Sequence, residues 1–182
     1  MKTKLGRRSG TTRVVLRRPK LSDGDEIIEM NRQSKKLHRP WVYAPLDKES
    51  WARYIERLES DRQHGSLVCL KDTGAIVGVI NMSEIVQGIF QSAYLGYYGG
   101  AAYAGQGYMT EGLSLLVNHA FNRLKLHRLE ANIQPGNNRS LALVRRLGFH
   151  KEGFSPRYLK IGGRWRDHER WAITREDWRG RS

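Results

Sequence analysis

Cysteine is nearly absent from this sequence, since Cys69 is the only one among 182 residues. A single cysteine cannot form a disulfide within the chain, which fits a reducing compartment. Cys69 lies in an apolar, strand-like run, and this setting favours a buried, unreactive thiol over a nucleophile. We therefore expect a cytoplasmic protein whose fold does not depend on disulfides.

Long apolar runs and acidic residues are also scarce. No run approaches the ~20 apolar residues that a membrane-spanning helix needs, and the basic N-terminus leads into no apolar segment, so we expect no signal peptide. Thirty-two Lys and Arg against 18 Asp and Glu give a formal net charge of +14. Such an excess favours contact with polyanions, such as RNA or the phosphates of a nucleotide, although a solvated basic surface would show the same composition. The six histidines lack metal-ligand spacing, and we predict no metal.

A glycine-rich loop stands between a strand-like run and a helical pattern. The run Ala93–Tyr98 is followed by glycines at 99, 100, 105 and 107, and then by apolar residues at three- and four-residue steps from Met109 to Leu124. A loop of this kind presents bare backbone N–H groups at the positive end of a helix, where phosphate groups bind. An ordinary tight turn would also contain such glycines. We predict a phosphate-bearing ligand at 105–110.

A second motif runs from Leu129 to Phe149. An alternating, strand-like segment leads into Pro135-Gly-Asn-Asn-Arg-Ser140, and a helical pattern then ends in Arg146-Leu-Gly-Phe149. Asn137 is a good helix N-cap, and Gly148 suits a left-handed C-cap.

Together these two motifs resemble the GNAT family of N-acetyltransferases, from about residue 14 to residue 178. Two shorter stretches, 94–97 and 162–168, look more narrowly like the ribosomal-protein alanine N-acetyltransferases. The resemblance implies acetyl-CoA as cosubstrate, and the N-terminal alanine or serine amine of a ribosomal protein as the acceptor. Two alternatives stay open: a GNAT enzyme that acetylates a small-molecule amine, and a ribosome-binding assembly factor that associates through its basic surface.

The resemblance also implies which residues bind acetyl-CoA. The pantetheine arm would follow the strand edge, and the pyrophosphate would meet the loop. Asn137 would hold a pantetheine amide, and Arg139, Arg145 or Arg146 would contact the nucleotide phosphate. The predicted cofactor-binding residues are Tyr97, Tyr98, Gly99, Gly105, Gln106, Gly107, Tyr108, Met109, Thr110, Asn137 and Arg139.

The catalytic residues follow less directly. Many members of the family carry a proton-donating tyrosine at the position of Val144, so Ser140 is the nearest hydroxyl that could protonate the departing thiolate. A role for Ser140 in the first helical turn is nearly as plausible, and capping by Asn137 is compatible with its role in binding. The general base is unresolved. Glu84, Glu130 and Tyr158 are candidates, although each could be structural, and an α-amine with a pKa of about 7.7–8 needs only a weak base.

The order of patterns predicts the fold class. We expect β-α-α-β-β-β-α-β-α-β-β, an α/β single domain with a mixed, mostly antiparallel sheet whose central strands splay apart, flanked by helices. Residues 1–12 should form a flexible basic leader, and 13–179 the N-acetyltransferase domain. Trp41 is interpreted as a packing residue, and Trp165 and Trp171 as aromatics that pack on the sheet.

Overall fold

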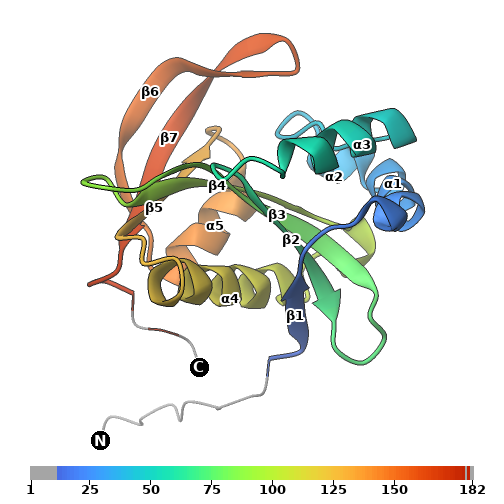
Figure 1. Cartoon of the computed structure of the whole chain (residues 1–182). Coiled ribbons are helices and arrows are strands. Elements are labelled where there is room, and N and C mark those ends of the chain that lie inside the picture. The colour runs from blue at the N-terminus through green and yellow to red at the C-terminus, as the bar shows by residue number, and fades with distance from the viewer. Residues whose placement is uncertain (1–11, 179, 181–182) are drawn as a thin grey trace, which may run out of the picture.

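The computed structural model describes residues 12–178 and residue 180. Its centre is a seven-stranded sheet in the order β1-β2-β3-β4-β5-β7-β6 (Figure 1). The strands are β1 Val14–Arg17, β2 His64–Leu70, β3 Ile76–Val86, β4 Ser92–Gly99, β5 Arg128–Ile133, β6 His150–Ile161 and β7 Arg164–Thr174. Only β4 and β5 pair in parallel, because α4 carries the chain back between them.

Helices cover both faces of the sheet. They are α1 Gly24–Gln33, α2 Lys35–His38, α3 Lys48–Arg57, α4 Tyr108–Asn122 and α5 Asn138–Leu147, with 3₁₀ turns η1 Leu21–Asp23 and η2 Ala101–Tyr103. The helices α4 and α5 pack on one face, and α1 to α3 lie on the other (Figure 1). Each face has its own apolar cluster, so the sheet is buried between two cores.

The apolar spacing of the sequence explains these layers. In α4 the residues Leu113, Leu116, Val117, Ala120 and Phe121 are all buried, as a helical stripe facing the sheet requires. The side chain of Asp47 caps α3 by accepting from Ser50 N at 2.7 Å. Gly148 ends α5 with φ +90°, a left-handed conformation that favours glycine.

The predicted splay of the central strands is confirmed. The strand β4 pairs with β3 from Ser92 to Gly99, but it pairs with β5 only from Ser92 to Tyr94. Beyond Tyr94 the two strands have separated, while β5 continues to pair with β7 as far as Ile133. The fork leaves one edge of β4 without a neighbouring strand.

The predicted fold class and element order are confirmed, with the short α2 as an addition. The prediction for Trp165 is wrong, because this residue lies on the β6–β7 hairpin with 61% of its surface exposed. Trp171 on the same strand is buried, as predicted. The predicted strand-like run Ala93–Tyr98 lies within β4, and Ile89 and Phe90 are exposed on the turn that precedes this strand. The predicted leader lies almost wholly outside the described residues.

Candidate active site

A cleft of about 1240 Å³ opens where β4 and β5 part. The glycine loop and α5 line one end of it, and β6, β7 and the α2–α3 connection contribute to the other. Every residue that the sequence predicted for cofactor binding or catalysis lines this cleft, apart from Gln106, the alternative base Glu130 and Arg145, whose guanidinium lies over the ring of Trp171. The structure therefore gathers most of the predicted residues around one space.

The free edge of β4 forms one wall of the cleft. Tyr97, Tyr98 and Gly99 pair with β3 on one side and face the gap on the other. Because strand residues alternate in the side to which their backbone groups point, part of this edge is available to a ligand that binds as an added strand. Opposite it, Asn132 of β5 lines the cleft with a buried side-chain oxygen that has no hydrogen-bond partner. Both walls thus present polar groups that suit an amide-containing ligand.

The glycine-rich segment forms a loop between β4 and α4, as the sequence predicted. Gly105 and Gly107 have φ values of +79° and +87°, and Gly107 is the N-cap of α4. A β-carbon at Gly107 would lie 3.3 Å from Arg13 Nη2, so the loop is closed on that side. The first turn of α4 begins directly after it, and its unpaired N–H groups and helix dipole favour an anion there.

Arg13 braces this loop from outside the motif. Its Nη2 donates to the carbonyl of Gln106 at 2.8 Å, and its Nε donates to Glu111 Oε1 at 2.8 Å. The guanidinium also stacks over the ring of Tyr108, 4.4 Å from its centroid. The Gln106 side chain turns away to donate to the Ala102 carbonyl at 3.0 Å, so Gln106 shapes the loop and does not line the cleft.

Met109 and Thr110 make contacts that hold α4 in place. The Met109 side chain packs against the paired glycines Gly78 and Gly99, where a β-carbon on Gly78 would come within 2.3 Å of the sulfur. The hydroxyl of Thr110 accepts from Arg146 Nη1 at 3.4 Å, which links the loop to α5.

Ser140 and Tyr97 meet at the centre of the cleft. The Ser140 Oγ and Tyr97 Oη atoms lie 2.6 Å apart, joining the start of α5 to β4. Burial raises the pKa of Tyr97 to about 12, although the hydrogen bond with Ser140 opposes the shift. The Asn137 side chain caps α5 by accepting from Ser140 N at 3.3 Å. The sequence predicted each of these residues, but it did not predict the contact between the two hydroxyl groups.

The three candidate bases lie apart from the contact between Ser140 and Tyr97. Glu84 lines the cleft on the irregular end of β3 and is bonded to Arg62. Tyr158 lines it from β6, where its ring meets His168 edge-on with centroids 6.2 Å apart. Glu130 accepts from Arg128 Nε at 2.9 Å and is not among the lining residues, so its contacts are those of a structural ion pair.

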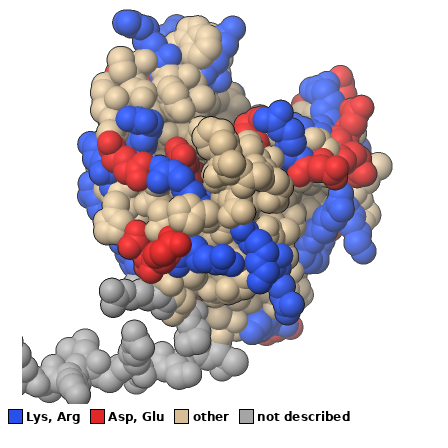
Figure 2. All heavy atoms as spheres, turned by 60° about the vertical axis from the view of Figure 1, so that its left-hand side comes forward, with Lys and Arg blue, Asp and Glu red and all other residues tan. Residues whose placement is uncertain are grey.

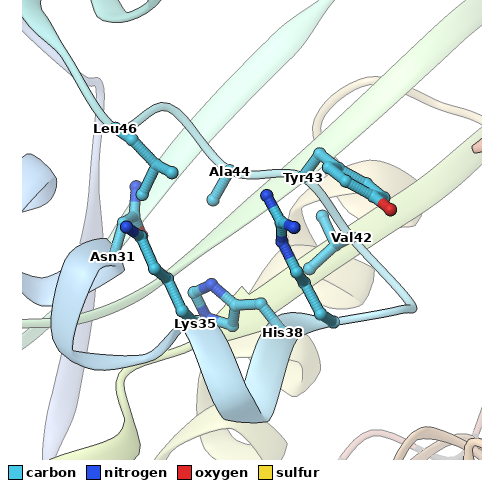
Figure 3. A pocket seen from close by; sticks show the side chains of 8 residues that line it. Asn31, Lys35, His38, Val42, Tyr43, Ala44 and Leu46 are labelled. Atoms are coloured by element: carbon cyan, nitrogen blue, oxygen red, sulfur yellow. The ribbon is translucent and has the colours of Figure 1, made fainter. Parts of the chain in front are cut away.

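His38 contacts the end of β4. Its Nε2–H donates to the carbonyl of Gly99 at 2.9 Å, and its ring packs edge-on against Tyr98. Beside it is a cavity of about 30 Å³, with Asn31, Lys35 and His38 on one side and Val42 to Leu46 on the other (Figure 3). Burial lowers the pKa of His38, against the opposing effect of the Gly99 carbonyl. No local sequence signal marks His38 or Arg13, because both act through distant partners.

The cleft has an excess of positive charge. Lys36, Arg139 and Arg146 line it, and Glu84 is the only acidic residue among its described lining residues. Basic side chains also gather at the end of the β6–β7 hairpin (Figure 2), where Arg157, Lys160 and Arg164 are exposed. An anionic ligand is therefore favoured over a polycationic one.

Within residues 12–178 we find no cluster of side chains that could hold a metal ion. No helix in that range is long and apolar enough to cross a membrane.

Comparison with known proteins gives a consistent result. Residues 13–150 match the family model described as acetyltransferase (GNAT) domain. The chain is 39% identical to the Bacillus subtilis protein named "Probable N-acetyltransferase YjcK", over 90% of this chain and 95% of that protein. It is 34% identical to the [ribosomal protein uS5]-alanine N-acetyltransferase of Escherichia coli, over 92% of this chain and 91% of that protein.

Solved structures agree with this result. The structure described as Mycobacterium smegmatis RimJ in complex with CoA-disulfide superposes with a TM-score of 0.83 at 29% identity, covering 90% of this chain and 82% of that one. A ribosomal-protein-S5-alanine acetyltransferase from Vibrio fischeri superposes with a TM-score of 0.80 at 26% identity, over 93% and 97% of the two chains. The forked sheet, the glycine loop at its mouth and these similarities together place the chain in the GNAT family of N-acetyltransferases.

Proposed function

We propose that this protein transfers an acetyl group from acetyl-CoA to the N-terminal amine of a protein. The observation that carries the proposal is the cleft at the β4–β5 fork, which ends at the glycine loop and the start of α4. The Mycobacterium smegmatis structure, described as a complex with CoA-disulfide, supports the same ligand class here.

The residues of the cleft fit the parts of acetyl-CoA. The first turn of α4 would receive the pyrophosphate, with Arg139 and Arg146 supplying positive charge nearby. The free edge of β4 and the side chains of Asn132 and Asn137 would bind the pantetheine amides. Acetyl-CoA supplies an activated thioester, and the protein has to position it, bind the amine and stabilise the charge that develops.

Ser140 is the proposed proton donor to the leaving sulfur. Its hydroxyl lies at the centre of the cleft, 2.6 Å from the Tyr97 hydroxyl. The amine needs little help, because an α-amino group with a pKa of about 7.7–8 is partly neutral at pH 7. Its proton would pass to water, to Glu84 or to Tyr158, which line the cleft. A backbone N–H on the free edge of β4 would stabilise the oxyanion.

The charge of the cleft favours a protein N-terminus over a polyamine as acceptor. A polyamine would have to enter a space lined by Lys36, Arg139 and Arg146, with Glu84 already paired to Arg62. A peptide brings one amine and a polar backbone, and the likeness to the uS5-alanine enzyme supports this class. We propose a ribosomal protein beginning with alanine or serine, acetylated in the cytoplasm.

Titration calorimetry with acetyl-CoA tests the cofactor. We expect binding at tens of micromolar or tighter, about 6 kcal/mol or more. Gly107→Glu should abolish it, because the side chain would add negative charge at the phosphate site. Gly74→Glu is the matched control, since Gly74 also has positive φ, +75°, but lies on an exposed turn with open space around it. Normal binding by Gly107→Glu would refute the loop assignment.

Intact-mass spectrometry tests the acceptor. Ribosomal proteins from cells with and without this protein should differ by one acetyl group on one of them. Purified enzyme should acetylate a peptide of that N-terminus faster than spermidine. A preference for spermidine, or no mass difference in any ribosomal protein, would remove the ribosomal acceptor.

We propose that residues 13–179 form the catalytic domain. Ribosome binding through the basic N-terminal residues stays a prediction, because 1–11 lie outside the described part of the chain.

A further inference from the structure

The geometry points to Tyr97 as the residue that positions the Ser140 hydroxyl for the leaving sulfur. We propose that the Tyr97 hydroxyl donates a hydrogen bond to Ser140 Oγ, so that the Ser140 hydroxyl hydrogen is directed into the cleft. This inference rests on the proposed function, and it assigns a side-chain role to a residue expected to contribute only the backbone edge of β4.

The Tyr97 and Ser140 hydroxyl groups lie in direct contact. Tyr97 Oη lies 2.6 Å from Ser140 Oγ and 3.4 Å from the Ser140 carbonyl oxygen, so the phenol meets Ser140 in the first turn of α5. Both residues line the cleft. The contact joins two residues that are 43 positions apart in the sequence, one on β4 and the other on α5, beside the fork of the sheet.

The direction of the hydrogen bond follows from acidity. A phenol is a stronger acid than an aliphatic alcohol, so in a short contact between the two the phenol is the better donor. The Ser140 backbone N–H is already bonded to Asn137, and the Asn137 cap fixes the start of the helix and therefore the position of Cβ. With Oγ accepting from Tyr97, the remaining freedom of the serine is the direction of its own proton, and the cleft is the open side.

Burial keeps the phenol in its donating form. It raises the pKa of Tyr97 to about 12, far above any working pH. A hydroxyl that accepts one hydrogen bond also becomes a stronger donor in the next, because chains of hydrogen bonds polarise one another. Tyr97 therefore needs to lose no proton during the reaction, and it acts as a positioning residue.

The test uses Tyr97→Phe, Ser140→Ala and the double variant in the full chain. Tyr54→Phe is the matched control, because it deletes another buried phenol that donates to a side chain, Asn81 Oδ1 at 2.7 Å, away from the cleft. We expect Tyr97→Phe to lower kcat about tenfold while KM for acetyl-CoA stays within twofold. In the Ser140→Ala background the same substitution should change kcat less than twofold, since the group through which it acts is gone.

A binding measurement provides a readout other than turnover. The thiol of free CoA ionises increasingly as the pH rises toward its pKa, and a directed Ser140 proton favours the thiolate. From pH 7 to pH 9 the affinity of the parent for CoA should rise severalfold relative to desulfo-CoA, which lacks the sulfur. Tyr97→Phe and Ser140→Ala should both lose that rise, and Tyr54→Phe should keep it.

Two results would overturn the proposal. One is a Tyr97→Phe variant with the kcat and the pH-dependent CoA affinity of the parent. The other is an equal loss of kcat in both backgrounds, which would mean that Tyr97 acts independently of Ser140. If the parent binds neither CoA nor desulfo-CoA, the proposed function is refuted, and the positioning role of Tyr97, which rests on it, is refuted as well.

Discussion

Ser140 makes two contacts that a single substitution can separate. Its backbone N–H donates to the Asn137 cap, while its Oγ meets Tyr97. Replacing the side chain with alanine removes only the second contact. The helix-forming role and the proposed proton-donating role of this residue therefore predict different outcomes for the same variant.

We expect Ser140→Ala to fold and to be slow. Loss of one hydrogen bond should cost about 1 kcal/mol of stability, whereas loss of general acid assistance should lower kcat by ~10²–10⁴. Steady-state kinetics and the melting temperature, measured on one preparation, give both numbers. If kcat stays within about threefold of the parent, short of that range, Ser140 is a helix residue, and Tyr158 or water becomes the candidate donor.

At the scale of elements, the glycine loop is held by a residue far from it in sequence. Arg13, just before β1, bonds to the carbonyl of Gln106 and to the carboxylate of Glu111. The helix dipole alone favours an acid such as Glu111 in the first turn of α4, and the ion pair with Arg13 adds a second reason for an acid at that position.

Arg13→Ala should weaken acetyl-CoA binding more than it weakens the fold. Half of the Arg13 side chain is exposed, so its ion pair should contribute no more than about 1 kcal/mol to stability. Releasing the loop should nevertheless reduce affinity about tenfold, equivalent to ~1.4 kcal/mol. Calorimetry and denaturant unfolding measure the two effects. Arg53→Ala removes a similarly exposed pair, with Glu49 on α3, and should leave affinity unchanged. Equal affinities for the two variants would contradict the bracing role.

The elements themselves could be predicted largely from local signals. Apolar spacing located α4 and α5, and the Asn137 and Gly148 caps fixed both ends of α5. Local signals failed where a strand ends in solvent. Trp165 has a strand-forming side chain and lies in β7, but the hairpin end projects beyond the helices, so no layer covers it. Strand propensity predicts a conformation and leaves burial undetermined.

At the scale of the whole molecule, the candidate site depends on contacts that local patterns do not encode. Tyr97 and Ser140 belong to different motifs, and His38 reaches Gly99 across 61 positions. Family resemblance placed Tyr97, Ser140 and Gly99 near the cofactor, but it did not point to His38. Their mutual geometry required the fork between β4 and β5, which is a property of the assembled sheet.

Two buried histidines and the half-buried His64 should make the stability of the whole domain depend on pH. Burial lowers the pKa values of His38, His64 and His168 below the ordinary value of 6.5. Below that value the unfolded chain binds protons that the folded chain excludes, so the free energy of unfolding falls as the pH drops. Carboxylates such as Glu152 and Glu169, whose pKa values are lowered by bonds to Arg128 and Lys151, act in a more acidic range.

Urea unfolding at pH 7.5 and pH 5.5 should therefore show a less stable parent at the lower pH. His38→Gln should lose less stability over the same interval, because glutamine can still donate to the Gly99 carbonyl but cannot become charged. The effect should be specific to the buried ring, since protonation would place a cation beside the cavity that Lys35 and Arg39 already line. His150→Gln, at an exposed position on β6, should retain the pH dependence of the parent. If the His38→Gln variant is as sensitive to acid as the parent, protonation of His38 does not destabilise the folded state.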